Sequence, residues 1–164
     1  MEEVERTLRW FYDYPKVVEL RHKSWSENSA ELGALLLDNR AGEVLIDEPK
    51  FAASIRQNAE AIGEIFYFRA HGRNAKAWWN PKESWERYDY LYSRDEIQGH
   101  PERIKTAAST AGVKKAFAFY NNHARANAPA NAIMLSQELA VRLKAMPPEG
   151  MVTKFPELVR RIAR

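Results

Sequence analysis

Glu64-Ile-Phe-Tyr-Phe-Arg69, which runs directly into Ala70-His71-Gly72-Arg73, is the clearest strand signal in the sequence. Apolar and aromatic residues fill its centre, and a charged, glycine-containing segment follows it. Short apolar runs of the same kind recur at 16–21, 43–47 and 113–120. Near-continuous apolar character is typical of strands that are buried on both faces of a parallel sheet. The sequence therefore predicts four such strands, each followed by polar residues.

Segments with the helical spacing of apolar residues separate these strands. Gly42 is a natural stop for the helix that precedes the second strand. Ser93-Arg-Asp-Glu96 has the spacing of a capping box, so a helical turn is expected there. Pro101 suits the first position of a further helix that Gly112 would end, and His100 before it is expected to be solvated or capping. The predicted helices cover 2–13, 26–39, 49–62, 101–112, 129–144 and 155–163. A helix followed by alternating strands and helices indicates an α/β fold with a parallel sheet.

Length and composition restrict the class of protein. The chain has 164 residues, and 25 Lys and Arg against 22 Asp and Glu leave a formal charge of +3. This length and an apolar fraction of 45% predict one folded domain over residues 1–164. The chain has no cysteine, which excludes disulfides and thiolate metal sites. No apolar run approaches the ~20 residues that span a bilayer, and the start of the chain lacks the apolar core of a secretion signal. We therefore expect a cytoplasmic protein without a membrane partner.

Polar side chains cluster where the predicted strands end. Because functional groups of α/β folds gather at the carboxyl ends of parallel strands, these positions predict a site. The candidates are Glu19, Arg21 and His22; Asp47 and Glu48; Arg69, His71 and Arg73; and Asn121, Asn122 and His123.

The predicted substrate-binding residues are mainly guanidinium and amide groups. Arginine forks match carboxylate or phosphate oxygens bidentately, so they could hold an anionic group. The two asparagines could orient a polar substrate, or they could form a turn, because asparagine tolerates left-handed backbone geometry. This set comprises Arg21, His22, Arg69, Arg73, Asn121, Asn122 and His123.

The predicted catalytic residues are Glu19, Asp47 and His71, which could act as acid and base groups or as oxygen and nitrogen metal ligands. No HxH or HExxH spacing supports a metal, so none is predicted, and the cofactor stays unknown. The structural alternative is that the carboxylates and arginines pair with each other across the strand ends.

The stretch Trp78 to Tyr92 is unusually aromatic, with three tryptophans and three tyrosines. Together with nearby lysines and arginines it could stack on single-stranded nucleic acid or on a sugar. Alternatively, the long loop folds over the end of the sheet and buries these rings as a lid. A net charge of +3 is too small to favour nucleic acid by itself.

Five motifs in this order resemble the YecE-like family, a domain of unknown function numbered 72. They are Val18-Glu-Leu-Arg-His-Lys-Ser-Trp25, Leu45-Ile-Asp-Glu-Pro49, Phe68-Arg-Ala-His-Gly-Arg73, Arg87-Tyr-Asp-Tyr-Leu-Tyr92 and Phe119-Tyr-Asn-Asn-His123. The resemblance implies a TIM-barrel-like fold whose activity is not established. The polar signature of the family falls on Glu19, Arg21, His22, Asp47, Arg69, His71, Gly72, Asn121 and Asn122.

The chain departs from the family in length. A (β/α)₈ barrel typically needs ~250 residues, and the Gly-Ser-Gly-Trp-type opening and the Gln-Leu-Pro-Pro-type segment of the family are absent. The resemblance therefore implies a half-barrel of about four parallel strand–helix units preceded by a helix, corresponding to the carboxyl-terminal part. Four barrel strands would leave two unpaired edges. We expect a separate chain with the missing half, a second copy of this chain, or a truncated gene product.

The function expected from these residues is an enzyme-like site, incomplete in this chain, for a small anionic or polyhydroxylated substrate. The alternatives are a nucleic-acid or carbohydrate binding module that uses residues 78–92, and a truncated fragment without function. Hydrolysis, isomerisation and lyase chemistry are equally compatible with the sequence.

Overall fold

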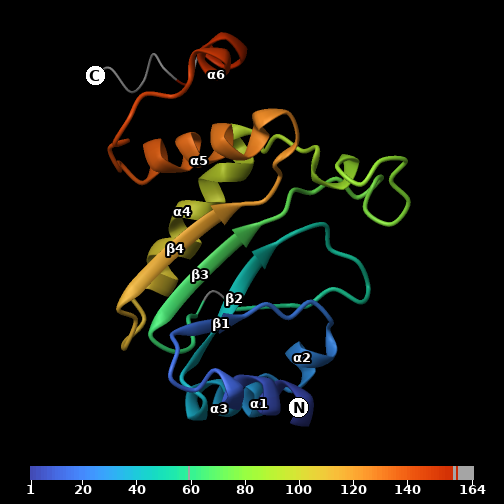
Figure 1. Ribbon diagram of the computed structural model, residues 1–164, viewed down its shortest axis with the longest axis vertical. Helices are drawn as coiled ribbons and strands as arrows, with labels where there is room; N and C mark the ends of the chain where they lie inside the picture. The colour runs from blue at the N-terminus through green and yellow to red at the C-terminus, as the bar shows by residue number, and fades with distance from the viewer. Residues whose placement is uncertain (59, 157, 159–164) are drawn as a thin grey trace. The chain divides into compact units, whose positions relative to one another are not determined.

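Four parallel strands in the order β1-β2-β3-β4 form the sheet of the computed structural model (Figure 1). They are β1 (Lys16–Val18), β2 (Ala41–Asp47), β3 (Ile65–Ala70) and β4 (Lys115–Tyr120). The register of the first pair places Val17 opposite Gly42. The α/β class and all four predicted strands are therefore confirmed, although β1 ends before Glu19.

The structure describes residues 1–58, 60–156 and 158, and it divides the chain into two compact units. The first unit comprises Met1–Arg69 and Arg103–Phe119, and the second comprises Ala70–Glu102 and Tyr120–Arg164. The prediction of one domain over residues 1–164 stays a prediction.

The helices agree with the sequence pattern at the beginning of the chain and differ from it later. The α-helices are α1 (Glu2–Trp10), α2 (Ser24–Glu27), α3 (Ser29–Asp38), α4 (Arg94–Ala108), α5 (Asn127–Glu138) and α6 (Glu149–Lys154). Two 3₁₀ turns, η1 (Glu86–Tyr88) and η2 (Ala124–Ala126), lie in the loops that follow β3 and β4. The predicted helix 129–144 corresponds to the shorter α5, and most of the predicted helix 155–163 lies outside the described residues.

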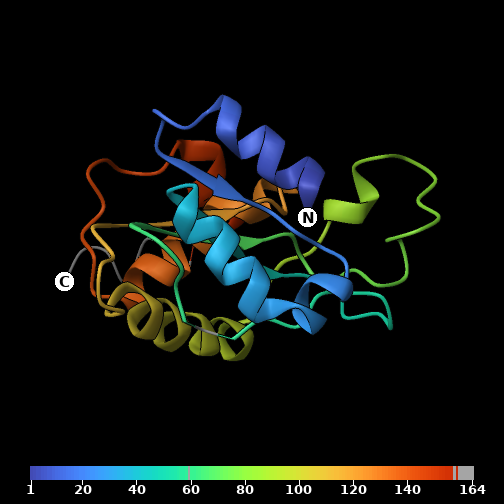
Figure 2. The ribbon, with the colours of Figure 1, turned by 90° about the horizontal axis from the view of Figure 1, so that it is seen from below.

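The core of the first unit lies between the sheet and its first helices. Both views show α1 and α3 beside β1 (Figures 1 and 2). Leu8 of α1 and Leu32 and Leu36 of α3 are at most 4% exposed. They pack in one cluster with apolar side chains of β2. This packing explains the helical spacing of leucines in the sequence, because one face of each helix is buried against the strands.

Gly42 does not stop a helix as predicted but lies inside β2. An added Cβ at Gly42 would lie 2.4 Å from the carbonyl oxygen of Ile65 in β3. The close approach of the neighbouring strand therefore accounts for the glycine. The chain leaves α3 instead through Arg40, whose φ of 55° is left-handed.

The predicted helix 49–62 is wrong, because its described residues contain no helix. Their backbone groups bond to the segment after β1: Ile55 N donates to Arg21 O at 2.7 Å, and Lys23 N donates to Ala53 O at 2.9 Å. Ser54 also forms an antiparallel bridge with His22. These bonds between distant segments replace the local bonds of a helix.

A single helix, α4, replaces the predicted turn at Ser93 and the separate helix at Pro101. The capping box forms as expected: Ser93 N donates to Glu96 Oε2 at 2.9 Å, and Glu96 N donates to Ser93 Oγ at 3.3 Å. Pro101 lies inside α4. His100 is 1% exposed, and its Nδ1 lies 2.8 Å from the Tyr120 hydroxyl, so the prediction of a solvated or capping histidine is wrong.

Within the described part of the chain, no helix has the length and apolar character needed to cross a membrane.

Candidate functional site

One carboxylate in the first unit holds two arginines. Glu19 follows β1, and its side chain is 17% exposed. Its Oε1 accepts a hydrogen bond from Arg21 Nε at 2.7 Å, and its Oε2 accepts one from Arg69 NH1 at 2.8 Å. Arg69 lies at the end of β3, so the ends of two strands are joined through Glu19. The structural alternative, in which carboxylates and arginines pair across the strand ends, is observed at these residues.

The end of β2 adds further charges to the same unit. Arg21 NH1 lies 3.7 Å from Glu48 Oε2, and Arg103 NH1 lies 3.7 Å from Asp47 Oδ2. Asp47 and Glu48 are buried. Burial lowers the pKa of Lys50, although the two neighbouring carboxylates favour its charged form. Sequence reasoning did not select Lys50 or Arg103; the position of Lys50 shortly after a strand end was the available signal.

His71 belongs to the second unit and is 1% exposed. Its Nδ1 lies 3.1 Å from the Asn121 side-chain amide nitrogen, which joins the segments that follow β3 and β4. The Trp78 ring packs edge-on against the imidazole at 6.5 Å between centroids. The buried histidine is therefore positioned by a polar contact and an aromatic one.

Asn122 belongs to a buried polar network that holds the Tyr90–Tyr92 segment. Its Nδ2 donates to Tyr90 O at 2.6 Å and to Asn131 Oδ1 at 2.7 Å. Asn131 also accepts from Tyr92 N at 3.0 Å and donates to Tyr92 O at 2.9 Å. Asn122 and Asn131 are both 0% exposed. This network gives Asn122 a role in loop architecture, and Asn131 was missed because it lies within a helix, away from the strand ends.

Arg73 extends from the loop after β3 toward α4. Its NH1 donates to Glu96 Oε1 at 3.3 Å, and its guanidinium lies 5.5 Å from the centroid of the Tyr92 ring. Gly72 has a φ of 91°, and its N–H donates to the Tyr92 hydroxyl at 2.9 Å. The positive φ gives a tight exit from the strand, which glycine permits because it has no side chain.

The contribution of Glu96 to the stability of the folded protein depends on pH. Burial raises the pKa of Glu96, but hydrogen bonds from the Tyr90 hydroxyl and Ser93 and the charge of Arg73 outweigh it, so the pKa is lowered overall. A lowered pKa in the folded state stabilises the protein above the unfolded pKa of about 4.3, and this contribution is lost as the pH falls through the folded value.

Glu96→Gln should therefore lower the free energy of unfolding by about 1 kcal/mol at pH 7, with a smaller difference at pH 3. Urea unfolding of both proteins at the two pH values measures this. Glu102→Gln, an exposed position on the same helix, is the control and should change little. A constant difference at both pH values would contradict the argument.

The remaining predicted histidines are exposed. His22 Nδ1 accepts a hydrogen bond from Ser24 N at 3.3 Å at the start of α2. His123 Nδ1 lies 3.1 Å from Asn121 O, and its ring packs against Tyr88 at 4.9 Å between centroids. The predicted site residues are divided between the two units. The first unit contains Glu19, Arg21, His22, Asp47 and Arg69. The second unit contains His71, Arg73, Asn121, Asn122 and His123.

The aromatic segment 78–92 divides into buried and exposed rings. Trp78 is 6% exposed and Tyr92 is 0% exposed, so these rings belong to the core. Trp79 is 70% exposed and Trp85 is 40% exposed, and the Arg125 guanidinium lies 5.5 Å from the Trp85 ring centroid. Part of the segment therefore has the packing expected of a folded loop, and part remains open to solvent.

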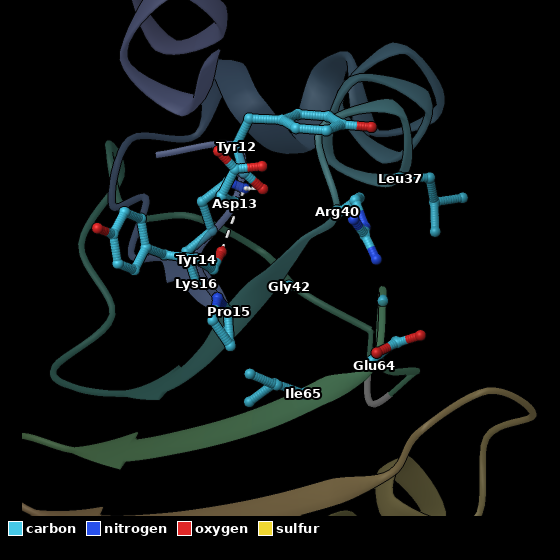
Figure 3. A pocket seen from close by; sticks show the side chains of 11 residues that line it. Tyr12, Asp13, Tyr14, Pro15, Lys16, Leu37, Arg40, Gly42, Glu64 and Ile65 are labelled. Carbon is cyan, nitrogen blue, oxygen red and sulfur yellow. Dashed lines mark hydrogen bonds between the residues drawn. The ribbon is translucent and has the colours of Figure 1, made fainter. Parts of the chain in front are cut away.

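A cavity of about 340 Å³ lies at the amino-terminal ends of β1, β2 and β3 in the first unit (Figure 3). Its lining comes from the loop before β1, the start of β2 and the start of β3, and it includes Tyr12, Lys16, Arg40 and Glu64. Figure 3 shows Lys16 beside Tyr14, with Arg40 and Glu64 across the opening. Ligands of α/β sheets bind at the carboxyl ends of strands, and this cavity lies at the other end.

Over residues 1–58, 60–156 and 158, no group of three or more histidine, aspartate or glutamate side chains is arranged to hold a metal ion.

The fold and these strand-end clusters define an α/β protein with paired acidic and basic residues at the carboxyl ends of parallel strands. A family model described as "Protein of unknown function DUF72" matches residues 1–154. The chain belongs to the DUF72 family, which confirms the YecE-like resemblance.

Two solved structures are similar to the chain. A DUF72 family protein from Enterococcus faecalis V583 matches with a TM-score of 0.77 and 24% identity, covering 90% of this chain and 55% of the other. A DUF72 family protein from Thermotoga maritima MSB8 matches with a TM-score of 0.71 and 32% identity, covering 85% of this chain and 50% of the other. The chain thus spans about half the length of these solved relatives. No curated protein matches it.

Proposed function

We propose that the strand ends of the first unit form part of an enzyme-like site for a small anionic or polyhydroxylated molecule. Arg21 and Arg69 bind the anionic group, and Glu19 positions both guanidiniums and accepts hydrogen bonds from substrate hydroxyls. The observation that carries this proposal is the single Glu19 carboxylate held by arginines from two strand ends, at 2.7 and 2.8 Å.

The two arginine side chains are exposed enough to bind a ligand in addition to pairing with Glu19. The side chains of Arg21 and Arg69 are 43% and 37% exposed, whereas Glu19 is 17% exposed. The contact of Arg69 with Glu19 uses one of the five N–H donors of a guanidinium, so others remain available to an anion at the surface. Asp47 is the further acid/base candidate in this unit, and His71 is the candidate in the second unit.

The proposal includes the fold of a half-barrel. Four parallel strands in sequential order, with polar groups at their carboxyl ends, support this part of the proposal, because the site of a TIM-type barrel lies at that end of its strands. Solved relatives of about twice the length support the idea that further chain completes the site.

Arg69→Ala should weaken the binding of glucose 6-phosphate at least tenfold, because this probe carries both hydroxyls and an anionic group. Arg69→Lys should retain part of the affinity, since lysine keeps the charge but not the planar fork. Isothermal titration with the full chain measures the effect, with glucose and inorganic phosphate as partial probes. Lys114→Ala, which removes an exposed positive charge, is the matched control.

Glu19→Gln gives a second test on the same site. This substitution removes the negative charge that offsets the positive charges of Arg21 and Arg69. Inorganic phosphate should therefore bind about tenfold more tightly. If phosphate affinity is unchanged in both Arg69→Ala and Glu19→Gln while circular dichroism shows an intact fold, the two arginines serve packing alone.

The second candidate function is stacking on a sugar or a single-stranded nucleic acid, favoured by the exposure of Trp79 and Trp85. A steep loss of oligonucleotide binding with salt would favour a phosphate backbone. Unchanged binding in Trp79→Ala and Trp85→Ala would exclude this function.

A further inference from the structure

The outer edge of β4 is open, since β3 is its one neighbour among the described strands. Lys115 N donates to Glu64 O, and Asn121 N donates to Ala70 O, at the two ends of the pairing. Because donors along a strand alternate in direction, the odd-numbered residues of β4 bond to β3. The N–H and C=O groups of Ala116 and Ala118 therefore face the open edge.

An exposed row of aromatic rings lies along this edge. Phe117 and Phe119 are 41% and 47% exposed. Phe119 stacks on Tyr67 of β3 at 4.8 Å between centroids, and the two phenylalanine rings are 6.4 Å apart. The row thus places apolar surface beside unpaired backbone groups, which together are a template for another strand.

We propose that the β4 edge pairs antiparallel with the β4 edge of a second copy of this chain, with the two-fold axis at Ala118. In this register Ala118 lies opposite Ala118 of the other copy and forms a hydrogen-bonded pair, as the outward groups require. Phe117 of each copy then lies opposite Phe119 of the other. Such aromatic pairs across non-hydrogen-bonded positions stabilise a sheet.

The properties of the edge favour a second copy as the occupant. The register is self-complementary, as a two-fold interface requires. It also brings no like charges together, because Lys115 lies opposite Asn121. The half of each solved relative that this chain matches is accompanied by about as much chain again, and a second copy supplies that amount.

The apolar area of this interface is small. Two half-exposed phenylalanine rings present roughly 150 Å² per copy and about 300 Å² over both copies, well below the ~1,200 Å² in total of a small specific interface. Paired backbone and flanking side chains supply the remainder, so we expect a dimer that dissociates on dilution. The edge of β1 is a weaker partner, because that strand has three residues and they are half-buried.

Light scattering across a range of concentrations tests the assembly, and a single cysteine tests the register. The chain has no cysteine, so Ala118→Cys introduces a unique thiol. Cα atoms of a hydrogen-bonded antiparallel pair are about 5.5 Å apart, within the range of a disulfide. Mild oxidation should give a covalent dimer of Ala118→Cys, and Thr106→Cys, exposed on α4, should give little.

Ala118→Pro should weaken the dimer at least tenfold, since proline removes the outward donor and is tolerated on an edge strand. Circular dichroism checks that the variant folds. A monomer at every concentration would overturn the proposal. A dimer that Ala118→Pro leaves intact, or in which Ala118→Cys does not cross-link, would also overturn it and would indicate another surface, such as β4 against β1 in a closed barrel.

Discussion

Replacing Gly42 by alanine should lower the free energy of unfolding by about 3 kcal/mol. Gly42 lies in β2 between β1 and β3, and its missing side chain lets both neighbours approach. A Cβ there would meet the Ile65 carbonyl oxygen at 2.4 Å and the Ile62 carbonyl oxygen at 3.0 Å. Both contacts are with backbone, so relief requires the strands to separate. Urea unfolding measures the change.

Gly33→Ala is the matched control, with the opposite sign. Gly33 lies in α3, and the nearest atom to an added Cβ is Ile62 Cδ1 at 3.9 Å, an ordinary contact. Alanine has the higher helix propensity, so this variant should gain about 0.5–1 kcal/mol. Equal changes in the free energy of unfolding for the two substitutions would show that the close strand spacing at Gly42 does not affect stability.

Asn131→Ala should have an effect of similar size, about 3 kcal/mol. The side chain accepts from Tyr92 N and Asn122 Nδ2 and donates to Tyr92 O, and it is 0% exposed. Its removal leaves the two buried backbone groups of Tyr92 without these bonds, and each such group costs about 1–3 kcal/mol.

Unfolding in urea and amide hydrogen exchange at Tyr92 together check this prediction. A loss of stability with unchanged protection of the Tyr92 amide would indicate that packing, and not the hydrogen bonds, is responsible. Asn28→Ala is the control: Asn28 is exposed, bonds only locally to Ser24 O at 2.9 Å, and should change stability by less than about 0.5 kcal/mol.

The strands were predictable because their signal is local. Phe66 and Phe68 are at most 1% exposed and sit in an uninterrupted apolar run, so composition alone identified β3. The capping box at Ser93 was equally local. By contrast, Phe51, Ile55 and Ile62 have helical spacing, yet the segment bonds to residues after β1. Periodicity does not report such bonds between distant segments.

The position of Pro101 within a helix depends on tertiary packing, which the sequence pattern does not show. Pro101 was expected to begin a helix, because proline inside one costs about 3 kcal/mol. Ile97 and Ile104, which are 0% and 7% exposed, anchor α4 on both sides of it. Burial of this kind stabilises a helix against a poor residue, and it is a tertiary property.

The candidate site followed from topology more than from motifs. Parallel strands bring their carboxyl ends to one edge, so Glu19 and Arg69 could be expected together although 50 positions separate them. Which carboxylate would hold which arginine depended on strand register and side-chain length. Lys50 lies three positions after the end of β2 and could have been selected on that ground, whereas Asn131 lies in α5, where the topology of the strand ends gives no guide.

The order of segments also determines how the first unit is completed during synthesis. The strands β1, β2 and β3 lie within residues 16–70 and β4 lies within 115–120, so residues 71–114 separate the third strand from the fourth. If the chain folds as it emerges from the ribosome, β3 is the outer strand of a three-stranded sheet until β4 has also emerged. In that case the face of the Tyr67 ring on which Phe119 stacks stays open to solvent until β4 pairs with β3.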